Sequence, residues 1–519
     1  MIDLRSHLSG KWVRGAGAGT TLVNPATEEP LASATTEGLD LGAAMRFARD
    51  VGGASLRAMT FRQRGAVLRE MSKAIHARRD ALIDVAIENG GNTRSDAKFD
   101  IDGAWGTLAA YADLSAELPD GKVLPDGDGV QLGRSPRLFG QHVRVPRHGV
   151  AVHVNAFNFP AWGLAEKAAC ALLAGMPVVS KPGTSTALLA YRIMELLVDA
   201  AVLPEGALSF VCGGAGDLLD HVGGQDVLAF TGGSSTGRSL RGGKAVLAHS
   251  VRVNVEADSL NAAVLGPDVE AGSDLLGLFV GDVARDMQQK TGQKCTAIRR
   301  VYVPKDRLAE VIELLVERLA AIRMGDPARE EVNMGPVATS AQRRDVLAGI
   351  AMLEQVARVV HRGPAETAHH AAGKGYFVPA TLLLSESPSG DDAVHTHEVF
   401  GPVATLVPYD GTGEAAARLV SWGGGGLVTS VYSDDRPFLS AAVLGLAPFH
   451  GRVTIGSSKI AQQALPPGMV LPQLIHGGPG RAGSGEELGG RRGLDFYTQR
   501  VALQGDRAIL EVLSGARAG

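Results

Sequence analysis

The sequence predicts an α/β protein with two doubly wound domains and a bridging β-ribbon. A chain of 519 residues exceeds what one hydrophobic core usually holds. Its hydrophobic residues (45%) and charged residues (20%) occur in the proportions of a globular protein. Two separate series of short apolar runs alternate with helical patterns, and this alternation is typical of parallel sheets covered by helices.

Helices are expected first, between about Leu41 and Gly90. Apolar residues recur there at three- and four-residue spacing, and a glycine pair ends the pattern. The segment from about Leu124 to Val145 differs, because glycine and proline turns interrupt an alternation of polar and apolar residues. This alternation favours a β-ribbon over a helix.

The first strand series begins after Arg147. Its apolar runs have strand length and end in glycine or proline turns: GVAVHV, MPVVSKP, ALSFVCGG and DVLAFTGG. The second series follows Cys295, with one long helical pattern, RLAEVIELLVERLAAIRM, and the strand candidates RVYVP, ATLLL, VATLVPYD, LVTSVYS and RVTIG. The late run TQRVALQG has strand-like residues suited to pairing with a similar ribbon of a partner subunit.

Composition argues against several classes of function. The net charge of −4 gives no electrostatic footprint for nucleic acid or an anionic membrane. No apolar run reaches the length of a membrane span, and the N-terminus lacks the apolar core of a secretion signal. The three cysteines show no C-x-x-C spacing, so neither a metal site nor a redox disulfide is expected. These features favour a reducing cytoplasm.

Cys295 is the candidate nucleophile. It lies in the polar, glycine-bearing stretch TGQKCT, whereas Cys170 and Cys212 lie in apolar runs and are expected in the core. Free thiols are often buried without a chemical role, so the assignment of Cys295 depends on partners elsewhere in the chain.

Two polar residues are candidate partners of that thiol. Glu256 lies in the apolar strand pattern VNVEADSLNA, where burial is expected to raise its pKa and suit it to proton transfer. Asn158, in NAFNFP, can aim an amide N–H at a developing alkoxide and lower the barrier by about 3 kcal/mol. Taken alone, an asparagine close to a proline is more simply a turn residue.

A glycine-rich turn, FTGGSSTG, follows the strand pattern DVLAF and opens a helix. Backbone N–H groups at such a helix start can bind a pyrophosphate. The pattern is weak alone, because glycine-rich turns are common and this one is not the six-residue dinucleotide fingerprint.

Together these segments resemble the aldehyde dehydrogenase superfamily over most of the chain, from about Asn24 to the C-terminal tail. In order, NAFNFP, VVSKPGTST, FTGGSSTG, VNVEADSL and HEVFGPV resemble the family motifs W-N-F-P, K-P-S-E, F-T-G-S-x-x-x-G, E-L-G-G and E-x-F-G-P. The resemblance implies a Rossmann-like cofactor-binding domain (1–124 and 146–256), a catalytic domain (257–455), a return segment to the cofactor domain (456–495) and an oligomerisation ribbon (125–145 with 496–519). A homodimer is expected, although a tetramer would use the same pieces.

The resemblance also implies oxidation of an aldehyde to a carboxylic acid through a thiohemiacetal and a thioester on Cys295. Asn158 and the Cys295 backbone N–H would hold the oxyanion, and Glu256 would deprotonate the hydrolytic water. The sequence ADS replaces the family's L-G-G after Glu256, so Asp258 is an alternative base. Two alternatives remain: a CoA-acylating enzyme, against which Glu256 argues, and a non-catalytic member of the family.

Cofactor contacts are implied in the same way. Thr184 stands where the family has a glutamate beside the adenosine ribose. A carboxylate there would repel a 2′-phosphate, whereas a hydroxyl beside Lys181 would accept it, so the sequence predicts NADP in preference to NAD. The full set of implied cofactor residues is Lys181, Thr184, Gly232, Ser234, Glu398 and Phe400.

The tail from His476 to Arg500, HGGPGRAGSGEELGGRRGLDFYTQR, resembles a narrower group of aldehyde dehydrogenases that accompany ring-opening enzymes for CoA-linked aromatic acids. This implies an acyl-CoA semialdehyde as the small-molecule substrate. A general aliphatic or aromatic aldehyde is the alternative. An acidic residue in this tail is implied to relay protons, and Asp495 is the candidate.

Overall fold

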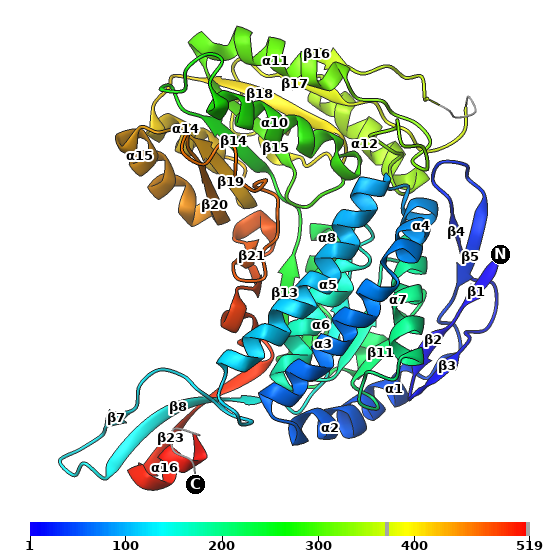
Figure 1. Ribbon diagram of the computed structural model, residues 1–519, viewed down its shortest axis with the longest axis vertical. Coiled ribbons are helices and arrows are strands. Elements are labelled where there is room, and N and C mark those ends of the chain that lie inside the picture. The colour runs from blue at the N-terminus through cyan, green and yellow to red at the C-terminus, as the bar shows by residue number, and fades with distance from the viewer. Residues whose placement is uncertain (369–372, 515–519) are drawn as a thin grey trace.

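The computed structural model of the protein describes residues 1–368 and 373–514. Two seven-stranded sheets form the bulk of the fold, and in Figure 1 the second lies at the top with the first below it. Each sheet is mostly parallel and carries helices on its faces, which confirms the predicted fold class.

Short strands precede the first helix, and these were not among the predicted elements. β2 and β3 extend the first large sheet in antiparallel fashion, whereas β1, β5 and β4 form a small sheet of their own. They have only three to five residues each, too few for a clear alternation of polar and apolar side chains. Their bounds are β1 (Ile2–Leu4), β2 (Ser6–Leu8), β3 (Lys11–Val13), β4 (Thr20–Val23) and β5 (Pro30–Ala34).

The helices predicted between residues 41 and 90 are present. A capping box formed by Thr60 and Gln63 starts the longest of them, and Gly91, in the left-handed conformation, ends the last. A single π-helical turn, Ala48–Gly52, joins the first two. The helices are α1 (Leu41–Phe47), α2 (Gly53–Ala58), α3 (Phe61–Ala77) and α4 (Arg79–Gly90), followed by α5 (Arg94–Glu117).

The first large sheet has the strand order β13-β12-β9-β10-β11-β2-β3, and its strands from β13 to β11 are parallel. Every residue of helix α6 is buried, because α6 is packed between this sheet and helices α3 and α5. The strands are β9 (Ala151–Val154), β10 (Val178–Lys181), β11 (Leu208–Phe210), β12 (Val227–Thr231) and β13 (Arg252–Glu256). The helices are α6 (Trp162–Ala174), α7 (Ala187–Asp199), α8 (Ser234–Arg241) and α9 (Lys244–Ala248).

The second large sheet has the order β16-β17-β18-β15-β14-β19-β20 and is parallel except at β16. Its strands are fully buried at the centre, as expected for a sheet covered on both faces. They are β14 (Asn261–Leu265), β15 (Ile298–Pro304), β16 (Arg358–Arg362), β17 (Thr381–Leu384), β18 (Val403–Tyr409), β19 (Gly426–Tyr432) and β20 (His450–Gly456). The helices are α10 (Asp274–Gln288), α11 (Leu308–Ala320), α12 (Ser340–Leu353), α13 (Ala393–Thr396), α14 (Gly413–Ser421) and α15 (Arg436–Leu446).

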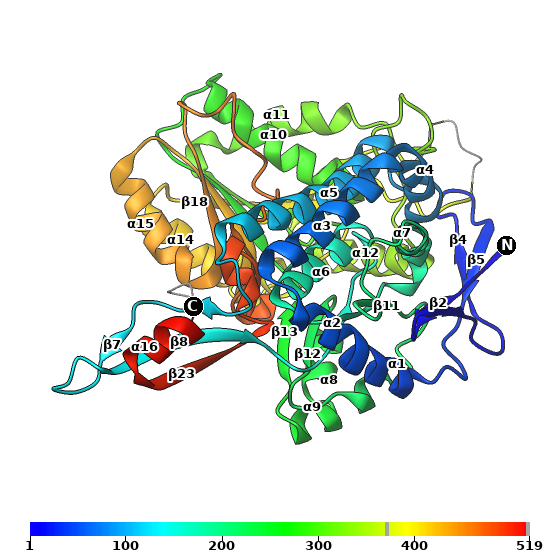
Figure 2. The same cartoon turned by 60° about the horizontal axis from the view of Figure 1, so that its bottom comes forward.

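A β-ribbon projects from the body of the molecule at the lower left of Figures 1 and 2. β23 pairs with β8 along its whole length, from Thr498 opposite Pro146 to Asp506 opposite Leu138. The run TQRVALQG therefore finds its strand partner in its own chain, and β23 is left at the edge of this sheet. The elements are β6 (Leu124–Pro125), β7 (Val130–Gln131), β8 (Leu138–Pro146), β23 (Thr498–Asp506) and α16 (Arg507–Leu513); residues 515–519 of the predicted ribbon lie outside the described residues.

A short hairpin of β21 (Ile475–Gly478) and β22 (Gly485–Leu488) brings the tail back to the end of β13. The Asn254 side chain fastens it, because its Nδ2 donates to Glu487 (3.0 Å) and its Oδ1 accepts from the Glu486 N–H (2.9 Å). Across the described ranges, no helix is both long and apolar enough to cross a bilayer.

Candidate active site

Cys295 lies in the loop between α10 and β15, and this loop has a strained backbone. Lys290 and Thr291 have φ values of 51° and 54°, in the left-handed region that side chains with a Cβ rarely adopt. Lys294 fixes the next segment through its ion pair with Asp286, at 2.7 Å with both side chains buried. The left-handed backbone conformation of Lys290 and Thr291 persists only because the surrounding structure enforces it.

The backbone on both sides of the thiol is fixed as well. Asn261 Nδ2 donates to the carbonyl oxygens of Cys295 (2.8 Å) and Ala297 (2.9 Å). Arg299 donates to the carbonyls of Gly292 (2.8 Å) and Lys294 (3.1 Å). The partly exposed Cys295 side chain is thereby held in one place, whereas Cys170 and Cys212 are buried as predicted.

Two cavities meet at this sulfur. The first has an empty volume of about 480 Å³ and aromatic walls from Phe99, Phe159 and Trp162. The second has an empty volume of about 930 Å³ and is lined by Gly232, Gly233, Asp258, Glu398 and Phe400, among others. The residues common to both walls are Ala156, Asn158, Thr231, Glu256 and Cys295.

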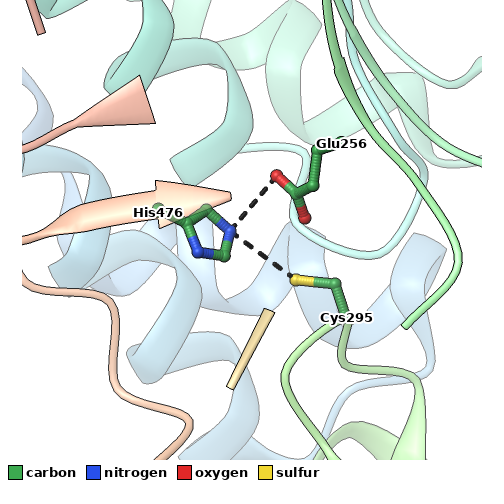
Figure 3. A group of neighbouring side chains, drawn as sticks. All are labelled: Glu256, Cys295 and His476. Atoms are coloured by element: carbon green, nitrogen blue, oxygen red, sulfur yellow. Dashed lines mark hydrogen bonds and ion pairs between the residues drawn. The ribbon is translucent and has the colours of Figure 1, made fainter. Parts of the chain in front are cut away.

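Glu256, Cys295 and His476 form a compact group (Figure 3). His476 Nε2 lies 3.2 Å from Glu256 Oε2 and 3.9 Å from Cys295 Sγ. Glu256 is the last residue of β13, and His476 is presented by β21 of the hairpin. Both side chains are 3% exposed, so their interaction takes place away from bulk water.

Electrostatics within this group differ from the expectation. Burial alone would raise the pKa of Glu256, but His476 and Lys167 lower it to about 2, so the predicted upward shift is wrong. Burial lowers the pKa of His476, but Glu256 raises it by a larger amount. The pKa of His476 therefore lies above its ordinary value. Burial and the charge of Glu256 raise the pKa of Cys295 well above its ordinary value.

A second polar cluster lies against Glu256. Lys167 Nζ is 3.1 Å from Glu166 Oε1 and 3.1 Å from Glu487 Oε2, and all three side chains are nearly buried. Burial raises the pKa of Glu487 to about 7. Oxygen atoms of Glu166, Glu256 and Glu487 lie within 4.8 Å of one another, so the charge on each of these acids affects the other two.

Asn158 forms part of the wall of both cavities. Its Nδ2 donates to the Gln293 carbonyl oxygen at 3.0 Å, two residues before Cys295 in the chain. An amide nitrogen carries two hydrogens, so one remains for a ligand at the sulfur. This placement suits stabilisation of an oxyanion formed on Cys295.

The sequence profile of the aldehyde dehydrogenase family matches residues 12–502. The chain belongs to the aldehyde dehydrogenase family. It is 44% identical to the 3,4-dehydroadipyl-CoA semialdehyde dehydrogenase of Aromatoleum evansii over 92% of this chain and 93% of that protein. It is 27% identical to the lactaldehyde dehydrogenase of Escherichia coli (strain K12) over 96% of this chain and 98% of that protein.

Solved structures of aldehyde dehydrogenases share this fold. The Escherichia coli lactaldehyde dehydrogenase superposes with a TM-score of 0.83 at 24% identity, covering 97% of this chain and 99% of that one. Betaine aldehyde dehydrogenase from Staphylococcus aureus in complex with NAD⁺ has the same TM-score at 22% identity, covering 98% of both chains. The protein is thus an NAD(P)-dependent aldehyde dehydrogenase with the fold of its family.

In this aldehyde dehydrogenase the wide cavity has features that fit a nicotinamide cofactor. Glu398 Oε2 accepts the Ser259 N–H at 3.2 Å, whereas its Oε1 is buried without a hydrogen-bond partner among the described residues. Burial raises the pKa of this carboxyl to about 7. A ribose hydroxyl would satisfy the open oxygen, and Phe400 and Gly232 line the same cavity.

Ser234, a predicted cofactor-binding residue, hydrogen-bonds to Asp258. Its N–H donates to Asp258 Oδ1 (3.0 Å) and its hydroxyl to Asp258 Oδ2 (2.7 Å). Asp258, which the sequence left as an alternative base, thus caps the N-terminus of α8. Motif matching missed this bond, because the family's L-G-G has no carboxylate at that place.

Lys181, the last residue of β10, lies beside Thr184. Lys181 Nζ is 3.4 Å from Thr184 Oγ1 and donates to the Pro182 carbonyl at 3.0 Å, and the Thr184 hydroxyl donates to Gly213 (2.9 Å). Burial lowers the pKa of Lys181, which leaves its charge sensitive to a nearby anion.

Asp495 is not brought to the site. It forms an ion pair with Arg144 of β8 at 3.0 Å and lies outside the walls of both cavities. The residues of the tail that do reach the site are His476 and Glu487, which sequence reasoning missed. Both lie within the tail segment from His476 to Arg500, but only the pairing of β21 with β22 beside β13 places them near Glu256.

Proposed function

We propose that this enzyme oxidises a CoA-linked semialdehyde to the corresponding acid, with NADP as its preferred cofactor. The observation that carries the proposal is the meeting of an aromatic cavity and a wide polar cavity at Cys295, with Glu256 in both walls. The relative from Aromatoleum evansii, whose name specifies such a semialdehyde, supports the substrate class.

Cys295 attacks the aldehyde carbon as a thiolate and forms a thiohemiacetal. The free N–H of Asn158 and the backbone N–H of Cys295 stabilise the oxygen as it gains charge, an effect of about 3 kcal/mol for one such donor. The aromatic walls formed by Phe99, Phe159 and Trp162 exclude water around an acyl chain in the first cavity.

Residues of the wide cavity would hold the cofactor. Glu398 would bind a ribose hydroxyl, Phe400 would pack beside the nicotinamide, and Gly232 would let the backbone approach the pyrophosphate. When bound there, the cofactor supplies the hydride acceptor that turns the thiohemiacetal into a thioester.

Glu256 deprotonates the water that hydrolyses the thioester. Its carboxylate is ionised because His476 and Lys167 lower its pKa despite burial, and the polar cluster of Lys167, Glu166 and Glu487 offers a route for the proton that it accepts. A base in this position favours release of the acyl group from Cys295 by water over its release by a thiol.

Thr184 supports the preference for NADP. Among the described residues, Lys181 hydrogen-bonds to the Thr184 hydroxyl and the Pro182 carbonyl and to no carboxylate. A 2′-phosphate can therefore bind the lysine without repulsion from a neighbouring acid.

Initial rates of reduced-cofactor formation test substrate and cofactor together. We expect a higher kcat/KM for a CoA-linked semialdehyde than for a matched medium-chain free aldehyde, and a higher value with NADP than with NAD. Equal or better rates with free aldehydes would reduce the proposal to a general aldehyde dehydrogenase. A clear advantage for NAD would contradict the argument from Thr184.

We further propose that the enzyme is a cytoplasmic homodimer. Each chain would divide into a cofactor-binding domain (1–124 and 146–256), a catalytic domain (257–455), a return segment (456–495) and an oligomerisation ribbon (125–145 with 496–519). Three free cysteines without a disulfide support a reducing compartment. The end of the first large sheet at Glu256 and the start of the second at Asn261 support the domain division.

A further inference from the structure

The wide cavity contains an acid that the proposed cofactor contacts do not use. Asp258 lies in the wall of this cavity together with Gly232 and Gly233, in the loop between β13 and β14. Its carboxylate accepts the Ser234 N–H at Oδ1 (3.0 Å) and the Ser234 hydroxyl at Oδ2 (2.7 Å). Because Ser234 is the first residue of α8, both hydrogen bonds hold the carboxylate at the N-terminus of that helix.

The N-terminus of α8 is also where the pyrophosphate of the cofactor is expected to bind. The first backbone N–H groups of a helix have no acceptor within the helix and carry partial positive charge, so they stabilise anions. A carboxylate and a pyrophosphate are both such anions. Asp258 therefore holds a hydrogen-bond donor that a pyrophosphate could use, and its negative charge opposes a second anion at the same helix end.

Glu398 connects this carboxylate to the cofactor cavity by an independent observation. Its side chain is 10% exposed and lines the same cavity, and its Oε1 is buried without a hydrogen-bond partner among the described residues. Burial and, to a smaller extent, the charge of Asp258 raise the pKa of Glu398 against the effect of Arg299. The two acids therefore act on each other across the space that would hold the cofactor.

We propose that Asp258 occupies the pyrophosphate position at α8 and thereby weakens the binding of NADP and NADPH. The carboxylate must leave Ser234, or accept repulsion beside it, when either form of the cofactor binds. Reduction does not change the pyrophosphate, so Asp258 weakens both forms alike and favours release of the product NADPH. The inference rests on the proposed binding of the cofactor in the wide cavity. The family motif E-L-G-G has glycine at this position, so the carboxylate distinguishes this chain from the motif.

The test is the Kd of NADP for the full-length enzyme, measured by isothermal titration calorimetry without substrate. Asparagine caps a helix about as well as aspartate does, so Asp258→Asn removes the charge and keeps an acceptor at α8. We expect a Kd at least about tenfold lower in this variant, which corresponds to about 1.4 kcal/mol. Two unit charges a few ångströms apart near a protein surface interact by at least this much.

A matched control is Asp268→Asn. Asp268 also accepts a serine hydroxyl and a backbone N–H, those of Ser433 (2.6 Å) and Asp434 (2.7 Å), but it lies outside the walls of both cavities. The Kd of NADP should be unchanged in this variant. Adenosine 2′-monophosphate, which lacks the pyrophosphate, should compete with NADP equally well in the wild type and, after allowance for the lower Kd of NADP, in Asp258→Asn. An equal gain in affinity for this nucleotide would overturn the inference.

Asp258→Gly restores the residue of the family motif and serves as the second variant if Asp258→Asn does not fold. It should also bind NADP more tightly than the wild type. An unchanged Kd in a folded variant would overturn the inference, and weaker binding would show instead that the carboxylate contacts the cofactor.

The same titrations separate this inference from the proposed function. If the wild type binds neither NADP nor NAD, the proposed cofactor site fails and the inference fails with it. If the wild type binds NAD more tightly than NADP, only the proposed preference fails. The effect of Asp258→Asn should then appear with NAD, because both cofactors carry the pyrophosphate. If the wild type binds NADP and the Asp258 variants bind it equally, the cofactor site stands and only the role of Asp258 is rejected.

Discussion

Glu256 and Glu398 show that burial alone does not decide the protonation state of an acid. Both carboxyl groups line the same cavity; Glu256 is buried, and the side chain of Glu398 is 10% exposed. Glu256 has His476 at 3.2 Å and Lys167 nearby, and its pKa falls to about 2. At Glu398 the effect of burial exceeds that of Arg299 at 3.8 Å, and its pKa rises to about 7. The charged neighbours, which the sequence does not display, determine the sign of the shift.

Glu398 gives a prediction for stability against pH. Its carboxyl binds a proton more tightly in the folded chain than in the unfolded chain, so its contribution to the free energy of unfolding falls as pH rises from about 4.5 to about 7. The fall amounts to about 3 kcal/mol. We expect Glu398→Gln to remove this component, measured by urea unfolding at pH 5 and pH 8.

The comparison is the difference between wild type and variant at each pH. The variant should gain in relative stability at the higher pH, because its amide does not ionise. A difference that stays constant between the two pH values would contradict the raised pKa of Glu398.

At the scale of elements, the β21–β22 hairpin completes the site. It carries His476 and Glu487, and Asn254 of β13 fastens it at two points. Of the strands from β9 to β20, all except β14 and β16 were predicted, because apolar runs of strand length between turns identify buried strands. The hairpin was not predicted, since its strands have four residues each and its turn is rich in glycine.

Asn254→Ala tests the hairpin. Removal of both hydrogen bonds leaves Glu487 with one fewer partner, so we expect a loss of about 1–3 kcal/mol in the free energy of unfolding together with a lower kcat. The control is Asn333→Ala, whose side chain accepts from the Arg323 N–H at 2.7 Å in a surface loop. Asn333→Ala should lower the free energy of unfolding without lowering kcat. An equal fall in kcat in both variants would argue against a special role for the hairpin.

For the whole molecule, the ribbon leaves apolar side chains facing water in the isolated chain. Val501 of β23 is 38% exposed, and Ile509 of α16, the helix that follows β23, is 60% exposed. Among the described residues, β23 pairs with β8 on one side and has no strand partner on the other. Such surfaces are usually covered by a partner. The proposed homodimer would cover them.

We expect Val501→Asp combined with Ile509→Asp to shift the enzyme from dimer to monomer in light scattering coupled to size-exclusion chromatography. Leu444→Asp is the matched control, since this apolar side chain is 73% exposed on α15, away from the ribbon. A double variant that remains dimeric would place the interface elsewhere.

Site residues in local motifs could be predicted from the sequence, whereas contacts between distant segments could not. Cys295, Glu256 and Asn158 were predicted because each lies in a local motif, and the structure brings all three to the same cavity walls. Asp495 was chosen from several acidic residues of the tail, because the sequence does not show which of these side chains reaches the active site. The cap that Asp258 forms on Ser234 depends on contact between two loops, which local spacing does not reveal.

The central claim is that Cys295 carries the acyl group and Glu256 releases it. The most direct measurement is rapid mixing of Glu256→Gln enzyme with NADP and a CoA-linked semialdehyde, followed by mass spectrometry of the Cys295 peptide. We expect a burst of NADPH approaching one equivalent per site, slow turnover afterwards and an acyl adduct on Cys295, all of which should be absent in Cys295→Ala. A missing burst, or an adduct on another residue, would contradict this account.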